Sequence, residues 1–176
     1  MEDLIRDWGY IILFLYSFGG GFLALAVAGV LSFTGELNIY ISLAVAVGAN
    51  FIGDQFLFYM ARSNKEFAKN ILDSHKRKVA YVHILMRKYG SFIILVKKYI
   101  YGVKTLVPLA IGLTKYSPLK FMIFNALGAV LWGVVVAGLS YNFGGFIIQS
   151  VEQYQNLGIA IAIVIVAFVF YLSSRK

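Results

Sequence analysis

The chain has 176 residues, of which 60% are hydrophobic, 16% are aromatic and only 14% are charged. Its mean hydropathy of +0.79 predicts an integral membrane protein and excludes an ordinary water-soluble domain. The length and the lack of a linker rich in proline or serine predict a single domain. The formal net charge of +8 would suit nucleic acid, but in so apolar a chain we assign the basic residues to loops at an anionic membrane surface and expect no nucleic-acid partner. The absence of cysteine excludes disulfides, thiol catalysis and thiolate metal sites.

The first apolar run, residues 8–33, is interrupted in its middle by Gly19, Gly20 and Gly21. Each glycine costs a helix about 1 kcal/mol relative to alanine. The interruption leaves two arms of about 12 residues, each about 18 Å long and too short to cross the hydrocarbon region. Such arms suit a re-entrant hairpin, although one spanning helix that uses glycine for close packing fits equally well. The acidic segment before the run lacks the basic region of a cleaved signal, so we expect the run to remain in the mature protein.

The second run, residues 39–61, is long enough to span the membrane and carries Asp54 near its middle. An acid in that place is typical of a proton or cation relay, or of the counter-ion of a lysine elsewhere in the bundle. A purely structural role in helix packing is the third interpretation.

Residues 62–91 contain eight lysine or arginine residues against two acidic ones, a net charge of +6 (8 − 2). This bias predicts a cytoplasmic connector. Its apolar residues recur at helical spacing, which fits amphipathic helices on the anionic inner leaflet, whereas a solvated charged loop is the simpler alternative. His75 and His83 have no partner at metal-ligand spacing, so we predict surface positions for both and no metal site.

The third run, residues 92–113, carries three lysines within a segment of membrane-spanning length. A cation in hydrocarbon costs at least about 2.5 kcal/mol, so such residues face a protein-lined cavity and indicate a functional site. We interpret Lys98 and Lys104 as the residues that hold an anionic headgroup. For Lys97 we favour a side chain that snorkels toward the inner interface.

Gly102 and Pro108 interrupt the third run much as the glycines interrupt the first. Two interrupted segments at corresponding places in two halves point to the binding site of a transporter. If both runs are re-entrant, 12 lysine and arginine residues lie on the cytoplasmic side of the membrane and one lies on the external side. If both runs cross fully, nine lie on the cytoplasmic side and four on the external side. The stronger inside bias favours hairpins.

Two more apolar runs follow, residues 121–143, which predict a spanning helix, and residues 157–172, which predict a final short one. The predicted fold is therefore an all-α integral membrane protein with an inverted repeat. Two re-entrant helical hairpins are each followed by a transmembrane helix, and a C-terminal transmembrane helix leaves the C-terminus in the cytoplasm.

Between residues 17 and 144 the chain resembles the DedA family of small bacterial membrane proteins, whose relatives include the SNARE-associated Golgi or VTT-domain proteins. The residues that carry the resemblance are, in chain order, Ala28-Gly29, Gly35-Glu36-Leu37-Asn38, Gly48-Ala49, Gly53-Asp54, Tyr59, Arg62, Lys98, Gly102-Val103-Lys104-Thr105-Leu106-Val107-Pro108, Ala110, Gly112-Leu113, Phe121, Asn125, Gly128-Ala129, Trp132, Gly138 to Tyr141, and Gly144.

The resemblance implies two re-entrant hairpins in inverted orientation in the bacterial cytoplasmic (inner) membrane. It also implies movement of lipids between leaflets, notably undecaprenyl or other polyprenyl phosphates, or phospholipids, coupled to the proton motive force. Where the family has two arginines around an Ile-Pro-Gly, this chain has Lys98 and Lys104 around Ile100-Tyr101-Gly102. Lysine keeps the charge but not the bidentate fork of arginine. The family's glutamate at the tip of the first hairpin has no counterpart here, so proton coupling through that acid is not carried over.

The functional hypothesis is a flippase-like or scramblase-like transporter that binds a lipid phosphate and works by alternating access, without a cofactor. The predicted substrate-binding residues are Lys98, Lys104, Tyr99, Tyr101, Gly102, Pro108, Gly19, Gly20 and Gly21; Asp54, Glu36 and Arg62 are candidates for ion coupling or counter-ions, and Asn125 and Trp132 are matched to the family. The alternatives are a proton-coupled antiporter for small ions or drugs and a non-transporting membrane-biogenesis or scaffold protein. An enzyme is not expected, because both histidines lie in the connector, away from the lysines. Homo-oligomerisation is left open.

Overall fold

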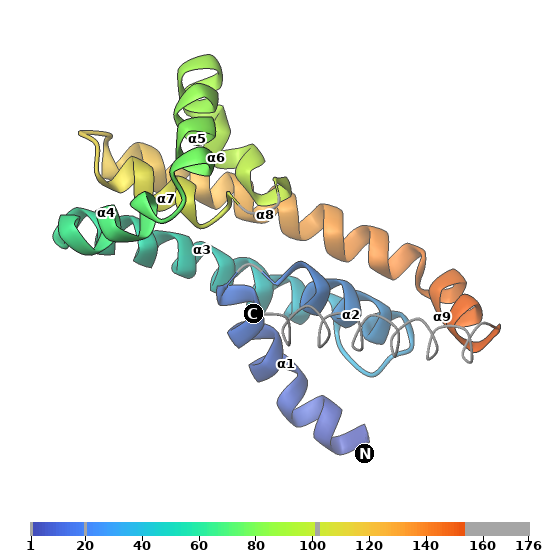
Figure 1. The fold of residues 1–176 in the computed structure, drawn as a ribbon. Helices are drawn as coiled ribbons and strands as arrows, with labels where there is room; N and C mark the ends of the chain where they lie inside the picture. Colours follow the sequence, from blue (N-terminus) through green and yellow to red (C-terminus); the bar gives the residue numbers. More distant parts are fainter. Residues whose placement is uncertain (1, 20, 101–102, 154–176) are drawn as a thin grey trace, which may run out of the picture.

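The computed structural model describes residues 2–19, 21–100 and 103–153, and within these ranges every regular element is helical (Figure 1). The two longest helices are α3 (Ile39–Ser63) and α8 (Pro118–Asn142), with 25 residues each. Both are long and apolar enough to cross a membrane. At 1.5 Å per residue each reaches about 37 Å, more than the roughly 30 Å of hydrocarbon. The predicted all-α class is confirmed.

Side-chain caps fix where the two long helices begin. The Asn38 side chain accepts hydrogen bonds from the backbone N–H groups of Tyr40 and Ile41 at the start of α3. At the start of α8 the Ser117 hydroxyl accepts from the Lys120 N–H, and Pro118 is the first helical residue. Both caps satisfy N–H groups that the first turn of a helix leaves without a partner.

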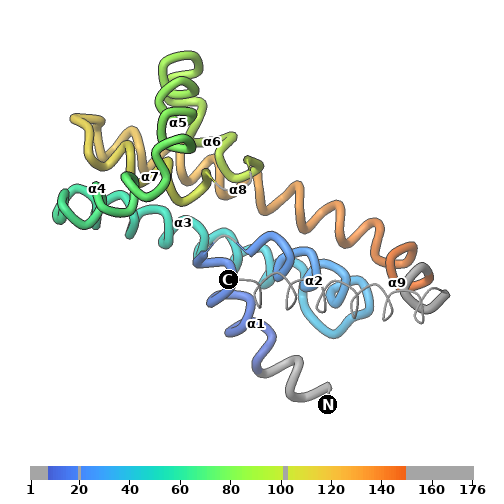
Figure 2. Tube along the Cα trace, viewed as in Figure 1, coloured from blue at the N-terminus to red at the C-terminus, as the bar shows by residue number. Residues whose placement is uncertain are grey.

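The first interrupted run forms two helices, α1 (Glu2–Phe18) and α2 (Phe22–Phe33), and the chain turns back between them (Figure 2). The break falls at the glycine run. The Gly21 N–H donates a 2.9 Å hydrogen bond to the Tyr16 carbonyl, so this amide is not available to an anion. The predicted role of Gly21 in substrate binding stays a prediction, and in this conformation its N–H closes the turn after α1.

The third run forms three short elements, α6 (Phe92–Val96), the 3₁₀ helix η1 (Lys97–Tyr99) and α7 (Leu106–Gly112). Pro108 does not interrupt this run. It lies in the first turn of α7, where its missing N–H is tolerated, and it is fully buried. The interruption lies before α7, so the assignment of Pro108 as a break is wrong, whereas its predicted role in substrate binding stays a prediction.

Within each interrupted run, one arm packs mainly on α3 and the other arm packs mainly on α8. In the first run α1 packs on α3 and α2 on α8, whereas in the second run α6 packs on α8 and α7 on α3. A glycine lies at each of these four contacts, where an added Cβ would approach the neighbouring helix closely: Gly53 at Phe18, Gly29 at Ser140, Gly128 at Leu95 and Gly112 at Phe58. Small residues of this kind allow close backbone approach between membrane helices.

The basic connector is helical and consists of α4 (Lys65–Asp73) and α5 (Lys76–Tyr89), with α5 projecting from the long helices (Figure 1). Its innermost apolar residues pack into a core with α7: Ala68, Leu72, Val82 and Leu85. The interpretation as a solvated loop is therefore wrong for these residues. The helical spacing of the connector is confirmed, although these four side chains face the protein core, and contact of the connector with the inner leaflet stays a prediction. His75 and His83 are exposed, as predicted.

The helix α9 (Gly144–Gln153) follows α8 and packs on α2. The predicted span at residues 157–172 and the C-terminus lie outside the described residues. Two apolar cores hold the rest together. One surrounds Phe58 and Phe121 and includes the connector helices, and the other surrounds Leu25 and Trp132 and includes α1 and α2.

Candidate functional site

Two lysines share one carboxylate between the two apolar cores. Asp54 projects from the middle of α3, and Lys97 and Lys98 project from η1. The Lys97 Nζ lies 2.7 Å from Asp54 Oδ1, and the Lys98 Nζ lies 2.6 Å from Asp54 Oδ2. The side chains of the two lysines are 0% and 3% exposed. The three groups together carry one net positive charge (2 − 1).

Two asparagines complete the surroundings of Lys98. Its ammonium donates to the Oδ1 of Asn50 on α3 and, at 3.3 Å, to the Oδ1 of Asn125 on α8. The Asn125 Nδ2 in turn donates a 3.1 Å hydrogen bond to the Phe51 carbonyl, which fixes the orientation of the amide. Lys98 therefore joins η1 to both long helices through oxygen atoms.

The structure corrects the interpretation of Lys97. This side chain does not snorkel to the interface, because it is fully buried against Asp54 and its Nζ lies 5.9 Å from the centre of the Phe121 ring. A nearby carboxylate and an aromatic face supply the ammonium with partners that the interface would otherwise provide. Lys97 is therefore part of the charged cluster.

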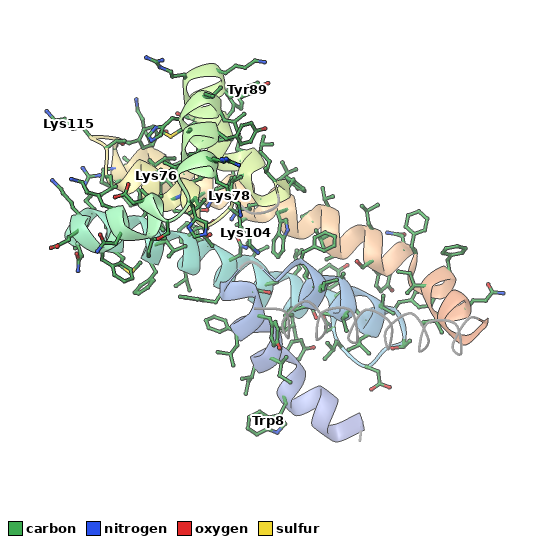
Figure 3. All side chains as sticks on the ribbon, in the orientation of Figure 1. Trp8, Lys76, Lys78, Tyr89, Lys104 and Lys115 are labelled. Atoms are coloured by element: carbon green, nitrogen blue, oxygen red, sulfur yellow. The ribbon has the colours of Figure 1, made fainter. Side chains whose placement is uncertain are left out.

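A small cavity of about 40 Å³ adjoins the cluster. Lys98 and Lys104 line it together with Asp54, and Gly19 and Trp132 also contribute to its wall. Figure 3 shows Lys104 near the middle of the molecule. The volume suits one or a few water molecules. The conformation is thus closed around a cationic cavity at the tip of the first interrupted run.

Other predicted residues lie away from this cavity. Tyr99 is 46% exposed and is not part of the cavity wall. Arg62 lies two turns beyond Asp54 on α3, where its guanidinium donates to the Tyr116 carbonyl at 2.9 Å and contacts the Phe58 ring. Glu36 lies in the turn before α3. The structure therefore places neither Arg62 nor Glu36 with Asp54. Gly20, Tyr101 and Gly102 lie outside the described residues.

Sequence reasoning missed Asn50 as a partner of Lys98, although the chain carries a signal for it. The pattern Asn-x-x-Gly occurs at Asn50 and Gly53 on α3 and again 75 residues later at Asn125 and Gly128 on α8. In both copies the asparagine accepts a hydrogen bond from Lys98, and the glycine allows an arm of an interrupted run to pack closely on the long helix. An internal comparison of the two halves would have identified the pair.

The site is a charged cluster of two buried lysines and one carboxylate within an apolar helical bundle. Among the described residues no group of three or more histidine, cysteine or acidic side chains is placed to hold a metal ion. The cavity wall includes Lys98 and Lys104 together with Phe18 and Gly19 at the end of the first arm. The fold and the site together define a helical membrane protein with interrupted helices and a buried cationic centre.

Comparison with known proteins agrees with this class. Residues 8–142 match the VTT domain, which is more than half of the chain. The chain therefore belongs to the VTT-domain family of membrane proteins, which includes DedA. The resemblance noted in the sequence is thereby confirmed.

Three relatives illustrate the match. Inner membrane protein YohD of Escherichia coli is 25% identical over 96% of this chain and 90% of its own length. Undecaprenyl phosphate transporter A of Staphylococcus aureus is 23% identical over 86% of this chain and 81% of its own. Protein DedA of Escherichia coli is 27% identical over 82% of this chain and 74% of its own. No solved structure matches the chain.

Proposed function

We propose that this protein moves an anionic lipid between the two leaflets of the bacterial inner membrane by binding its phosphate headgroup. The observation that carries the proposal is the excess of cation in the buried cluster, where two lysines share the carboxylate of Asp54. A buried positive charge without its own counter-ion is costly, and an anion that enters the site relieves that cost. The relative named for undecaprenyl phosphate transport supports a polyprenyl phosphate as the substrate, and a phospholipid is the second choice.

In the proposed mechanism Lys98 and Lys104 bind the phosphate, and Asp54 holds Lys98 while the site is empty. Lysine suits this task as a point charge that binds phosphate oxygens without the planar fork of arginine. The cavity of about 40 Å³ is too small for a lipid headgroup, so the described conformation is the closed one. Entry of the lipid requires the end of α1 to separate from the lysines, while the hydrocarbon chain stays in the bilayer.

The packing of the interrupted runs supports alternating access through an inverted repeat. When α1, α2 and α3 are exchanged with α6, α7 and α8, the main contacts are preserved, because each first arm packs on the long helix that follows it and each second arm packs on the other one. We propose that the two interrupted runs are re-entrant hairpins that enter from opposite sides. Rocking of one repeat against the other then exposes the site to each side in turn.

The proposed orientation places the connector, residues 62–91, in the cytoplasm, in line with its net charge of +6 (8 − 2). Because the chain has no cysteine, single cysteines report the side of the membrane directly. Two re-entrant hairpins put Lys69→Cys and Lys115→Cys on the same side, whereas two complete crossings put them on opposite sides. Both lysines are exposed, so labelling with a membrane-impermeant maleimide in oriented vesicles distinguishes the two topologies.

The function is tested by leaflet-to-leaflet transfer in proteoliposomes that carry either a fluorescent polyprenyl phosphate or a labelled phosphatidylethanolamine. We expect faster transfer of one of these lipids with the wild type, loss of transfer in Lys104→Ala, and wild-type transfer in Lys115→Ala. The last variant removes the same charge from an exposed turn outside the cavity. No transfer by well-folded wild-type protein would contradict the proposal and would favour the scaffold or the antiporter. Release of phosphate from the lipid would indicate an enzyme instead.

A further inference from the structure

Lys97 and Lys98 are neighbours in the chain but occupy different positions in the cluster. Lys97 contacts Asp54 through Oδ1, is fully buried and does not line the cavity. Lys98 contacts the other oxygen, Oδ2, and does line the cavity. The two oxygens of one carboxylate therefore hold one lysine that faces the protein interior and one that faces the space for a ligand.

We propose that Lys97 is the standing counter-ion of Asp54 and that it thereby releases Lys98 to exchange the carboxylate for the phosphate of a lipid. This inference rests on the proposed function, because it assigns a role within the same anion site. Lys97 is a positioning residue, since it acts on the ligand only through Asp54 and Lys98.

The electrostatic argument compares the cluster with and without Lys97. Without it, Asp54 and Lys98 form a neutral pair, and a phosphate that attracts Lys98 leaves a carboxylate buried without a partner. Breaking a buried ion pair in this way is strongly unfavourable. With Lys97 present, Asp54 keeps its 2.7 Å partner when Lys98 moves, and the cluster retains one net positive charge for the anion.

The surroundings of Lys98 are also suited to exchange. Apart from Asp54, its partners are the amide oxygens of Asn50 and Asn125, which carry no net charge. A hydrogen bond to a neutral amide is weaker than one to a carboxylate and is given up at smaller cost. Lys97 has no comparable route to the ligand, because its ammonium lies between Asp54 and the Phe121 ring.

The test measures binding of farnesyl phosphate, with farnesol as the uncharged control, to the full-length protein in nanodiscs. The variants are Lys97→Met, Lys97→Arg and the double variant Lys97→Met/Asp54→Asn. Loss of one buried charge weakens farnesyl phosphate binding in Lys97→Met about tenfold or more. Lys97→Arg keeps the charge and binds like the wild type. The double variant restores a net charge of one to the cluster and recovers binding, which a merely structural role of Lys97 does not predict.

Two other results separate failure of this inference from failure of the proposed function. If the wild type does not bind farnesyl phosphate better than farnesol, or if Lys98→Met binds it as well as the wild type, the proposed function itself is wrong. If those two comparisons come out as expected but Lys97→Met binds like the wild type, the role of Lys97 is refuted. A double variant that folds but stays as weak as Lys97→Met refutes it as well.

Discussion

Replacing Asp54 by asparagine tests how the charged cluster is stabilised. The substitution leaves the fully buried ammonium of Lys97 without its carboxylate, whereas Lys98 keeps the oxygens of Asn50 and Asn125. Removing one partner of a buried ion pair costs about 3–5 kcal/mol. We therefore expect Asp54→Asn to lose about 3–5 kcal/mol of unfolding free energy, with Lys97 responsible for most of the loss.

The matched variant Lys97→Met removes the other partner but creates no unpaired charge. Asp54 keeps Lys98 at 2.6 Å, and the methionine fills most of the space of the lysine stem. The expected loss is only about 1 kcal/mol, the size of an ordinary hydrogen-bond contribution. In the double variant Lys97→Met/Asp54→Asn the unpaired ammonium of Lys97 is gone and Lys98 keeps the oxygens of Asn50 and Asn125, so most of the stability lost in Asp54→Asn returns.

The assay is equilibrium unfolding in mixed micelles with a denaturing detergent, followed by tryptophan fluorescence. The chain has two tryptophans, and Trp132 is buried beside the cavity, so its emission reports loss of the core. An Asp54→Asn protein as stable as the wild type would refute the reasoning. So would a Lys97→Met protein destabilised as strongly as Asp54→Asn, because the two substitutions would then be energetically symmetric.

Two further substitutions test the packing. Gly53→Ala places a Cβ against the Phe18 carbonyl at the contact of α1 with α3, so we expect a loss of about 1–3 kcal/mol in the same unfolding assay. The control is Gly48→Ala on the same helix, whose added Cβ has no neighbouring atom within 4 Å and which gains up to about 1 kcal/mol of stability. Equal effects of the two substitutions would exclude the contact as the cause. Arg62→Met removes a 2.9 Å hydrogen bond to the Tyr116 carbonyl and lowers stability by about 1–3 kcal/mol, whereas an unchanged unfolding midpoint would show that the turn before α8 is held by other contacts.

Apolar run length and glycine position predicted much of the helical arrangement. The two candidate spans lie where the second and fourth apolar runs were found, and the first run breaks at its glycines. The predicted break at Pro108 was wrong because proline interrupts a helix only beyond its first turn, and the sequence did not show that α7 begins just before Pro108. The connector misled because its apolar face is the same whether a protein core or a membrane covers it. The entry of the two hairpins from opposite sides stays a prediction.

For the site, the cost of charge in an apolar segment drew attention to the right residues. Lys98, Lys104 and Asp54 lie around one cavity, and their roles in binding stay predictions. The burial of Lys97 was not foreseeable from run length, because it depends on the tight turn of η1 that directs two consecutive lysines to one carboxylate. The pairing of Asn50 with Lys98 depends in the same way on which faces of α3 and η1 meet.

The repeated Asn-x-x-Gly segments of α3 and α8 match in packing but not in charge. The residue that follows the glycine is Asp54 in the first copy and the buried Ala129 in the second. If the two repeats exchange roles during transport, the two states of the empty carrier differ in energy, because only α3 supplies a carboxylate to the lysines. Lys97 stays with Asp54 throughout, so the difference falls on Lys98, which lies beside the carboxylate in one state and leaves it in the other. A phosphate carried by Lys98 replaces that carboxylate, so that the loaded protein changes state more readily than the empty one.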